Sequence, residues 1–216
     1  RYRFVIPAEN RLAHYDDTSP VGAIVLLERN PQTLEPEVVK LAPGEGLLQL
    51  LSQNFADSDT PDKELIERLL PLIQHVPCLM LRYCEPLAGA RYLAKAIDNT
   101  HLQDANNASL LNYVPASTED AVPCDLDSVW LPAEGVSSYS LGEELFLIHP
   151  ATGDIHRLNA SGKIAWQLLQ HEPVSGHALS DVIAAYFNAP LNAVTADMGG
   201  LLRALSQAGL IAAPDA

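Results

Sequence analysis

The chain contains few cysteines, and their number and placement exclude two classes of protein. Its 216 residues include only Cys78, Cys84 and Cys124, which are too few and too unevenly spaced for a disulfide framework. None of them forms a Cys-x-x-Cys pair, so we expect neither a zinc site nor a redox motif built on cysteine. A chain with this cysteine content is typical of a reducing compartment, and we expect a cytoplasmic location.

Basic residues and long apolar runs are also scarce. The chain has 13 Lys and Arg against 27 Asp and Glu, a net charge of −14, which argues against nucleic acid or an anionic membrane as partner. The longest apolar runs, such as "VGAIVLL" at 21–27, are far shorter than the roughly 20 residues that span a bilayer. We therefore expect a peptide, a protein or a small molecule as partner.

What the chain does have is enough apolar sequence for two domains. Hydrophobic residues make up 48% of the chain, which we expect to form a core in each of two halves. Residues 98–126 are rich in Asn, Asp, Ser, Thr and Pro without helical or strand periodicity, which predicts a linker between domains at 1–97 and 127–212. The chain opens at Arg1 in a strand-like "RYRFVIP", and we expect it to be the trailing part of a longer polypeptide.

The first half has a mixed α and β pattern. The run of branched apolar residues at 21–29 predicts a strand that is buried on both faces. Helices are predicted at 42–55 and at 60–76, the second with Thr60 as N-cap, Pro61 at the first helical position and a bend or early end at Pro71. A strand at 77–83 and a helix at 85–97 follow.

The second half shows four short extended segments and then three helices. The strands are predicted at 127–132, 136–141, 144–150 and 154–159, the last two joined by the hairpin-length loop 151–153. The helices are predicted at 159–170, at 177–187 and from 192 to a stop at Gly209, the first capped by Asn159 or Ser161. Their apolar spacing assigns these residues to the core: Ile164, Trp166, Leu168, Leu169, Leu179, Val182, Ile183, Tyr186, Val194, Met198, Leu201, Leu202 and Leu205. A β-hairpin on three short helices predicts a winged helix-turn-helix, and the chain as a whole is of the α+β class.

A Ser-Gly-Lys triplet at 161–163 has some likeness to a phosphate-binding loop, but its surroundings exclude that function. The loop needs a glycine five residues before the Gly-Lys pair and Ser or Thr after it, where this chain has Arg157 and Ile164. No complete G-x-x-x-x-G-K-[ST] motif occurs in the chain.

The order of motifs in the second half carries a family resemblance. The segments "YSLGEELFLIHPATGDIHRLNASGKIAWQLLQ", "SDVIAAYFNAP" and "DMGGLLRALSQAGLI" resemble the pyrroloquinoline-quinone biosynthesis protein D (PqqD) family, the peptide-binding modules called RiPP recognition elements. The matching features are an apolar strand, Gly153 in a hairpin, Leu158-Asn159 before a helix with Trp166, and a last helix that ends in Gly-Leu-Ile. The likeness covers about residues 127–212.

The resemblance implies a non-catalytic protein that binds the leader of a precursor peptide and presents it to a modifying enzyme or kinase partner. Members of this family add the peptide as a strand to an exposed sheet edge, beside a groove against a helix. In this chain that edge is the strand 154–158 and the wall is the helix 194–205. The residues it implies for peptide binding are Asp154, Ile155, His156, Arg157, Leu158, Val194, Met198, Leu201 and Leu202.

The first half has a second resemblance. "PVGAIVLLER", "LAPGEGLLQLL" and "LIQHVPCLMLRYCEPLAGARYLAKAI" resemble the C-terminal part of HPr-kinase-like P-loop kinases. This implies an alternative in which the chain is part of a serine kinase acting on a peptide or small protein. Because the nucleotide-binding loop is missing, we assign no catalytic, cofactor-binding or metal-binding residue, and we expect no enzyme activity from this chain alone.

Simpler interpretations remain open for several residues. Leu201, Leu202 and Leu205 have the spacing of ordinary core positions. His149 and His156 stand seven positions apart across a turn, a spacing that would let them face each other and ligate a metal, but the sequence has no third ligand at a recognisable spacing. The "HYDD" segment at 14–17 has the composition of a solvated loop. Gly199 and Gly200 indicate either a close approach by a partner or a kinked helix. A winged-helix DNA binder is disfavoured, because residues 111–216 hold three basic against twelve acidic residues.

Overall fold

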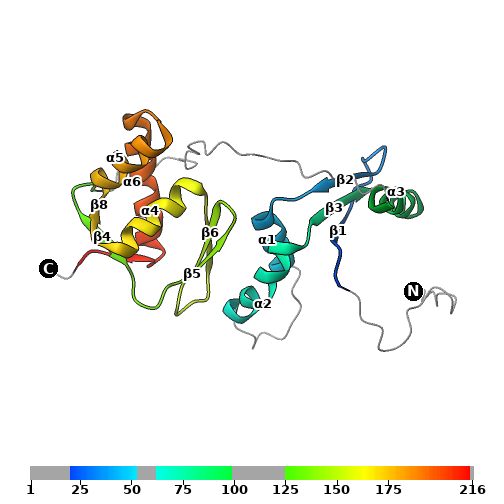
Figure 1. Ribbon diagram of the computed structural model, residues 1–216, viewed down its shortest axis with the longest axis horizontal. Coiled ribbons are helices and arrows are strands. Elements are labelled where there is room, and N and C mark those ends of the chain that lie inside the picture. The colour runs from blue at the N-terminus through cyan, green and yellow to red at the C-terminus, as the bar shows by residue number, and fades with distance from the viewer. Residues whose placement is uncertain (1–19, 53–61, 99–124, 215–216) are drawn as a thin grey trace.

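A computed structural model describes residues 20–52, 62–98 and 125–214 of the chain. The first part of it is a three-stranded sheet with helices on both faces (Figure 1). Its strands are β1 (Ile24–Arg29), β2 (Glu37–Lys40) and β3 (Cys78–Tyr83), in the order β1-β3-β2. The central β3 is parallel to β1 and antiparallel to β2, so this half has the mixed α and β architecture that its sequence predicts.

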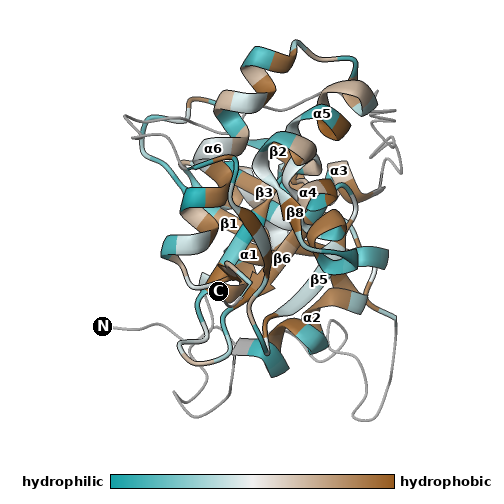
Figure 2. Cartoon of the chain, turned by 90° about the vertical axis from the view of Figure 1, so that its left-hand side faces the viewer, coloured by the Kyte–Doolittle hydropathy of each residue, from teal (hydrophilic) through white to brown (hydrophobic). Residues whose placement is uncertain are grey.

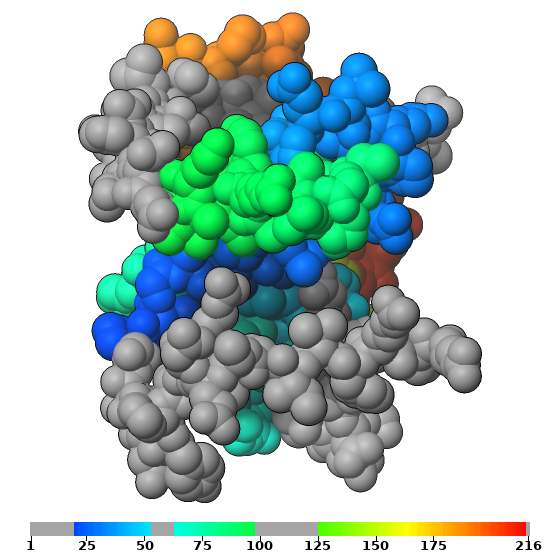
Figure 3. Space-filling model, turned by 90° about the vertical axis from the view of Figure 1, so that its right-hand side faces the viewer, coloured from blue at the N-terminus to red at the C-terminus, as the bar shows by residue number. Residues whose placement is uncertain are grey.

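Two helices cover one face of this sheet and a third covers the other. Helices α1 (Pro43–Ser52) and α2 (Asp62–His75) pack on each other and share a hydrophobic cluster with Leu26 and Cys78 of the sheet. Helix α3 (Pro86–Asp98) packs on β3 and β2, and Figure 3 shows it lying across the surface of this half with β1 below it. Gly89 permits this contact, since a Cβ there would lie 3.0 Å from the Tyr83 side chain.

One prediction for the first half is wrong. Strand β1 is not buried on both faces: it is an edge strand among the described residues, and Leu27 is 63% exposed. Of the bend or early end predicted at Pro71, the early end does not occur, because α2 continues through Pro71 to His75, and the bend stays a prediction. The predicted cap Thr60 and first-turn Pro61 lie outside the described residues.

The second half has two small antiparallel sheets and three helices. One sheet holds β4 (Val129–Pro132) between β8 (Val174–Ser175) and β9 (Ile211–Ala212), and the other holds β5 (Ser137–Leu141), β6 (Glu144–Ile148) and β7 (Ile155–Leu158) in that order. The helices are α4 (Ala160–His171), α5 (Gly176–Phe187) and α6 (Leu191–Gln207). Asn159 is the N-cap of α4, since its side chain accepts a hydrogen bond of 3.0 Å from the Gly162 N–H.

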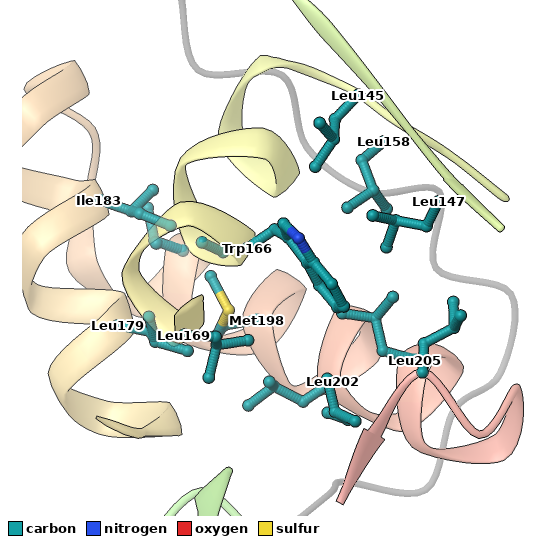
Figure 4. Packing of buried hydrophobic residues seen from close by; sticks show 14 of the residues in the cluster. Leu145, Leu147, Leu158, Trp166, Leu169, Leu179, Ile183, Met198, Leu202 and Leu205 are labelled. Atoms are coloured by element: carbon teal, nitrogen blue, oxygen red, sulfur yellow. The ribbon is translucent and has the colours of Figure 1, made fainter. Parts of the chain in front are cut away.

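Trp166 lies at the centre of the core of this half. Its ring is 1% exposed, and Figure 4 shows leucines of β6 and β7 on one side of it and side chains of α5 and α6 on the other. Two predicted core positions on α5 are wrong, because Val182 and Tyr186 are 46% and 58% exposed. Each of the three helices carries both polar and apolar residues, as expected of a helix with one buried face (Figure 2).

Strand β6 belongs to two cores at once. Leu145 and Leu147 point into the cluster around Trp166, whereas Phe146 and Ile148 point the other way, into the cluster with α1 and α2. The sequence predicts a separate core in each half, but the core of the first half includes this outer face of the β5-β6-β7 sheet. Figure 1 shows β5 and β6 beside α1 and α2. The two halves are therefore joined by buried apolar surface.

The chain has the α+β class that its sequence predicts, whereas the winged-helix and kinase-like descriptions of its parts stay predictions. Within the described ranges, no helix is long and apolar enough to cross a membrane.

Candidate peptide-binding site

Strand β7 forms one edge of the β5-β6-β7 sheet, and no other strand of the described residues pairs with its outer side. A tight turn places it there: Gly153 adopts a φ of 76°, a left-handed conformation that favours glycine. The Asp154 carboxylate accepts a hydrogen bond of 2.7 Å from the Thr152 hydroxyl, which fixes the turn just before the strand. The predicted edge at 154–158 is therefore an edge in the structure.

The pairing register shows which backbone groups of β7 point outward. Leu147 is paired with His156 and Leu145 with Leu158, while the turn before β6 joins Leu141 to Glu144. In an antiparallel sheet each residue directs its N–H and C=O to one side only, alternating along the strand. The pair at the two-residue turn is hydrogen-bonded, so Glu144 directs its N–H and C=O groups to β5. By alternation, Leu145 and Leu147 direct theirs to β7, and their partners Leu158 and His156 are therefore the residues of β7 that bond to β6. The N–H and C=O groups of Ile155 and Arg157 then lie along the free edge.

The side chains of β7 divide between the two faces of the sheet. Leu158 is buried in the core around Trp166, and His156 lies on the same face. Ile155 packs against the cluster of α1 and α2, and Arg157 points to that face as well. Ile155 and Arg157 thus have their backbone N–H and C=O groups on the free edge and their side chains against the first half of the chain.

Arg157 connects the edge strand to helix α1. Its Nε donates to Glu144 Oε1 at 2.7 Å, its Nη2 donates to the same carboxylate, and its Nη1 donates to Glu45 Oε2 at 3.2 Å. Gly44 makes room for this arrangement, because a Cβ there would lie 1.7 Å from Glu144 Oε2. Glu144 also lies at the N-terminal turn of α1, where the helix dipole favours a carboxylate.

The opposite edge of the sheet has its own polar link to the first half. The Tyr139 hydroxyl on β5 donates to Glu67 Oε1 on α2 at 2.8 Å. Burial and this neighbouring carboxylate raise the pKa of Tyr139 above its usual value. Each edge of the sheet therefore makes a polar side-chain contact with the first half, Arg157 with Glu45 at β7 and Tyr139 with Glu67 at β5.

The structure corrects the expected groove wall on α6. Val194, Met198 and Leu202 are 0%, 3% and 0% exposed, and Figure 4 shows Met198 and Leu202 directed into the interior with Trp166. They are core residues because α6 turns this stripe toward α4 and α5. Leu201 is half-buried at the margin of that core. Helix α6 runs unbroken through Gly199 and Gly200.

His149, one of the two histidines of the hairpin, has a structural role in the turn. His149 Nδ1 accepts hydrogen bonds of 3.2 Å from the N–H groups of Ala151 and Thr152, so this ring atom stabilises the turn. Among the described residues, no group of three or more His, Cys, Asp or Glu is placed to hold a metal ion. The "HYDD" segment at 14–17 lies outside those residues.

Sequence reasoning missed the contribution of α1. Glu45 lies 112 residues before Arg157, and no local pattern indicates their contact. One usable signal was the unbroken apolar run from Leu145 to Ile148, which is typical of a strand buried on both faces. It predicts that a second layer covers the sheet but does not say which segment forms it.

Comparisons with known proteins find a similar solved structure and a matching family. A solved structure described as "TbiB1 in Complex with the TbiA(beta) Leader Peptide" is 27% identical, with a TM-score of 0.36, and the alignment covers 40% of this chain and 99% of that one. No curated protein matches the sequence. Residues 144–211, which run from the first residue of β6 to the first residue of β9, match the family described as coenzyme PQQ synthesis protein D (PqqD).

Proposed function

We propose that this chain binds a segment of a precursor peptide by strand addition at the free edge of β7 and presents it to a modifying enzyme. The observation that carries the proposal is this edge, with the N–H and C=O groups of Ile155 and Arg157 unpaired by any strand of the described residues. The match of residues 144–211 to the PqqD family supports it, because the resemblance implies peptide binding of this kind. Strand addition needs only backbone groups in an extended row, so it tolerates varied peptide sequences.

The proposed contact surface differs in one respect from the residues that the sequence indicates. Asp154, Ile155, His156, Arg157 and Leu158 form the edge itself. Leu201 lies at the margin of the α6 core and is kept as a contact, whereas Val194, Met198 and Leu202 are buried in that core and are not proposed as contacts. A bound peptide then places alternate side chains toward the helices of the second half and toward the first half.

The test uses a substitution that removes one donor from the free edge. Ile155→Pro deletes the outward N–H without touching the ladder to β6, since that ladder uses His156 and Leu158. Ile155→Ala controls for the lost side chain, and Ser140→Pro places a proline at an outward position of the opposite edge strand β5. The probe is a display library of random 12-residue peptides, from which binders of the full chain are selected and titrated by fluorescence anisotropy.

We expect Ile155→Pro to weaken binding of the selected peptides by tenfold or more, and the two control substitutions to change it little. Bound peptide should also slow hydrogen exchange at the amides of Ile155 and Arg157. If no selected peptide protects these amides, or if Ser140→Pro weakens binding as much as Ile155→Pro, strand addition at β7 is wrong.

The kinase-like alternative for residues 1–97 rests on its sequence resemblance alone. The parallel β1–β3 pair between helical layers is compatible with an α/β nucleotide-binding domain. It predicts binding of ATP, whereas the peptide-binding proposal predicts none. DNA binding remains disfavoured by the charge of residues 111–216.

A further inference from the structure

We propose that Glu45 of helix α1 is part of the peptide site and selects a basic side chain at the peptide position that pairs with Arg157. This inference rests on the proposed strand addition at β7. It assigns a role in recognition to the first half of the chain, which the family match at 144–211 does not reach.

The register of an added strand brings that peptide position to Glu45. Residues paired across neighbouring strands direct their side chains to the same face of a sheet. Arg157 points to the face that α1 and α2 cover, so the peptide residue paired with it points there as well. The peptide residue paired with His156 points instead to the helices of the second half.

The charged side chains around Arg157 do not balance one another. One guanidinium, that of Arg157, is shared by two carboxylates, those of Glu45 and Glu144, which leaves a net charge of −1. The Glu144 side chain is 20% exposed, whereas that of Glu45 is 42% exposed and remains open to a further cation. Within the described part of the chain, the donor to Glu45 Oε1 is the neutral Gln49 Nε2, at 3.2 Å. A Lys or Arg of the peptide would complete the charge pairing, and a peptide carboxylate would be repelled.

Glu45 is held in place by the packing of its helix. Leu47, two residues further along α1, is fully buried in the cluster that includes Phe146 and Ile148 of the sheet. The close approach of Gly44 to Glu144 fixes the first turn of α1 over β6, the strand that holds Glu144, Phe146 and Ile148. The carboxylate is therefore positioned before any peptide arrives, which lowers the entropy cost of using it.

The experiment is a double-mutant cycle on the full chain. Peptides are selected from the random 12-residue library, those that protect the amides of Ile155 and Arg157 are kept, and each Lys or Arg in them is changed to Gln in turn. Dissociation constants are measured with the wild-type chain, with Glu45→Gln and with Glu67→Gln. Glu67 is the matched control because it joins α2 to the same sheet at the far edge, through Tyr139.

We expect one basic peptide position whose change to Gln weakens binding to the wild-type chain and to Glu67→Gln by about two- to fivefold, the range of an exposed ion pair. The same change should have no effect on Glu45→Gln. If β7-binding peptides carry no basic residue, or if every basic position gives the same loss with Glu45→Gln as with wild type, the role of Glu45 is wrong while strand addition stands. If no peptide protects β7, strand addition itself fails and this inference fails with it.

Discussion

The Arg157 guanidinium of edge strand β7 donates to the Glu45 carboxylate of helix α1 at 3.2 Å, across 112 residues of sequence. The contact joins the strand proposed to bind peptide to a helix of the other half. Because the buried cluster beneath it includes residues of both halves, we expect the stability of the two halves to be coupled.

The close approach of α1 to β6 depends on Gly44. We expect Gly44→Leu to lower the free energy of unfolding by about 1–3 kcal/mol, the usual cost of overpacking, because the new side chain displaces the Glu144 carboxylate. Leucine is a good helix former, so the loss would not arise from helix propensity. Urea denaturation measures it. Gly22→Leu is the control, since no atom of the described residues lies within 4 Å of a Cβ at Gly22; equal effects of the two substitutions would contradict the prediction.

Phe146 should stabilise both halves together. Its side chain is fully buried between the sheet and the helices of the first half. Phe146→Ala should therefore lower the free energy of unfolding, measured by urea denaturation, by about 3–5 kcal/mol. Hydrogen exchange should become faster in α1 and α2 as well as in β6. Leu34→Ala, at a fully exposed position, should change stability by no more than about 0.5 kcal/mol. Unchanged exchange in α1 and α2 would show that this contact does not hold the first half.

The contact between Tyr139 and Glu67 should make stability depend on pH in the alkaline range. The folded chain raises the pKa of Tyr139, so the folded state holds this proton more tightly than the unfolded state. Its contribution is complete below the unfolded pKa of about 10 and is lost as pH rises through the higher folded value. Wild type should therefore lose more free energy of unfolding than Tyr139→Phe between about pH 9 and 11. Parallel pH profiles of the two proteins would rule out this linkage.

Asn159 directly follows the proposed peptide edge and is the N-cap of α4. Its side chain accepts from the Gly162 N–H, so Asn159→Ala should cost about 0.5–2 kcal/mol in chemical denaturation. Gln167→Ala changes an exposed residue of the same helix and should cost little or nothing, because alanine is the best helix former. A similar loss from both substitutions would mean that the cap contributes nothing measurable.

Local sequence determined most of the secondary structure. Asn159 before an apolar stripe specifies the start of α4, and Gly153 specifies the hairpin between β6 and β7, because capping and positive φ depend on a few neighbouring residues. The motif order in 144–211 likewise pointed to the family that the comparison finds. These features need no knowledge of the rest of the fold.

Tertiary structure alone decided which faces are covered. Val182 and Val194 both have the helical spacing of core positions, yet Val182 is exposed and Val194 is fully buried. The difference arises because burial depends on which element packs against each helix. Likewise, no local pattern joins Glu45 to Arg157 or makes Gly44 the point of contact with Glu144. The sequence by itself determined where the strands and helices form. The sheet order that leaves β7 at an edge and the packing of α1 on β6 beside that edge were decided by tertiary structure, since long-range contacts depend on the whole folded chain.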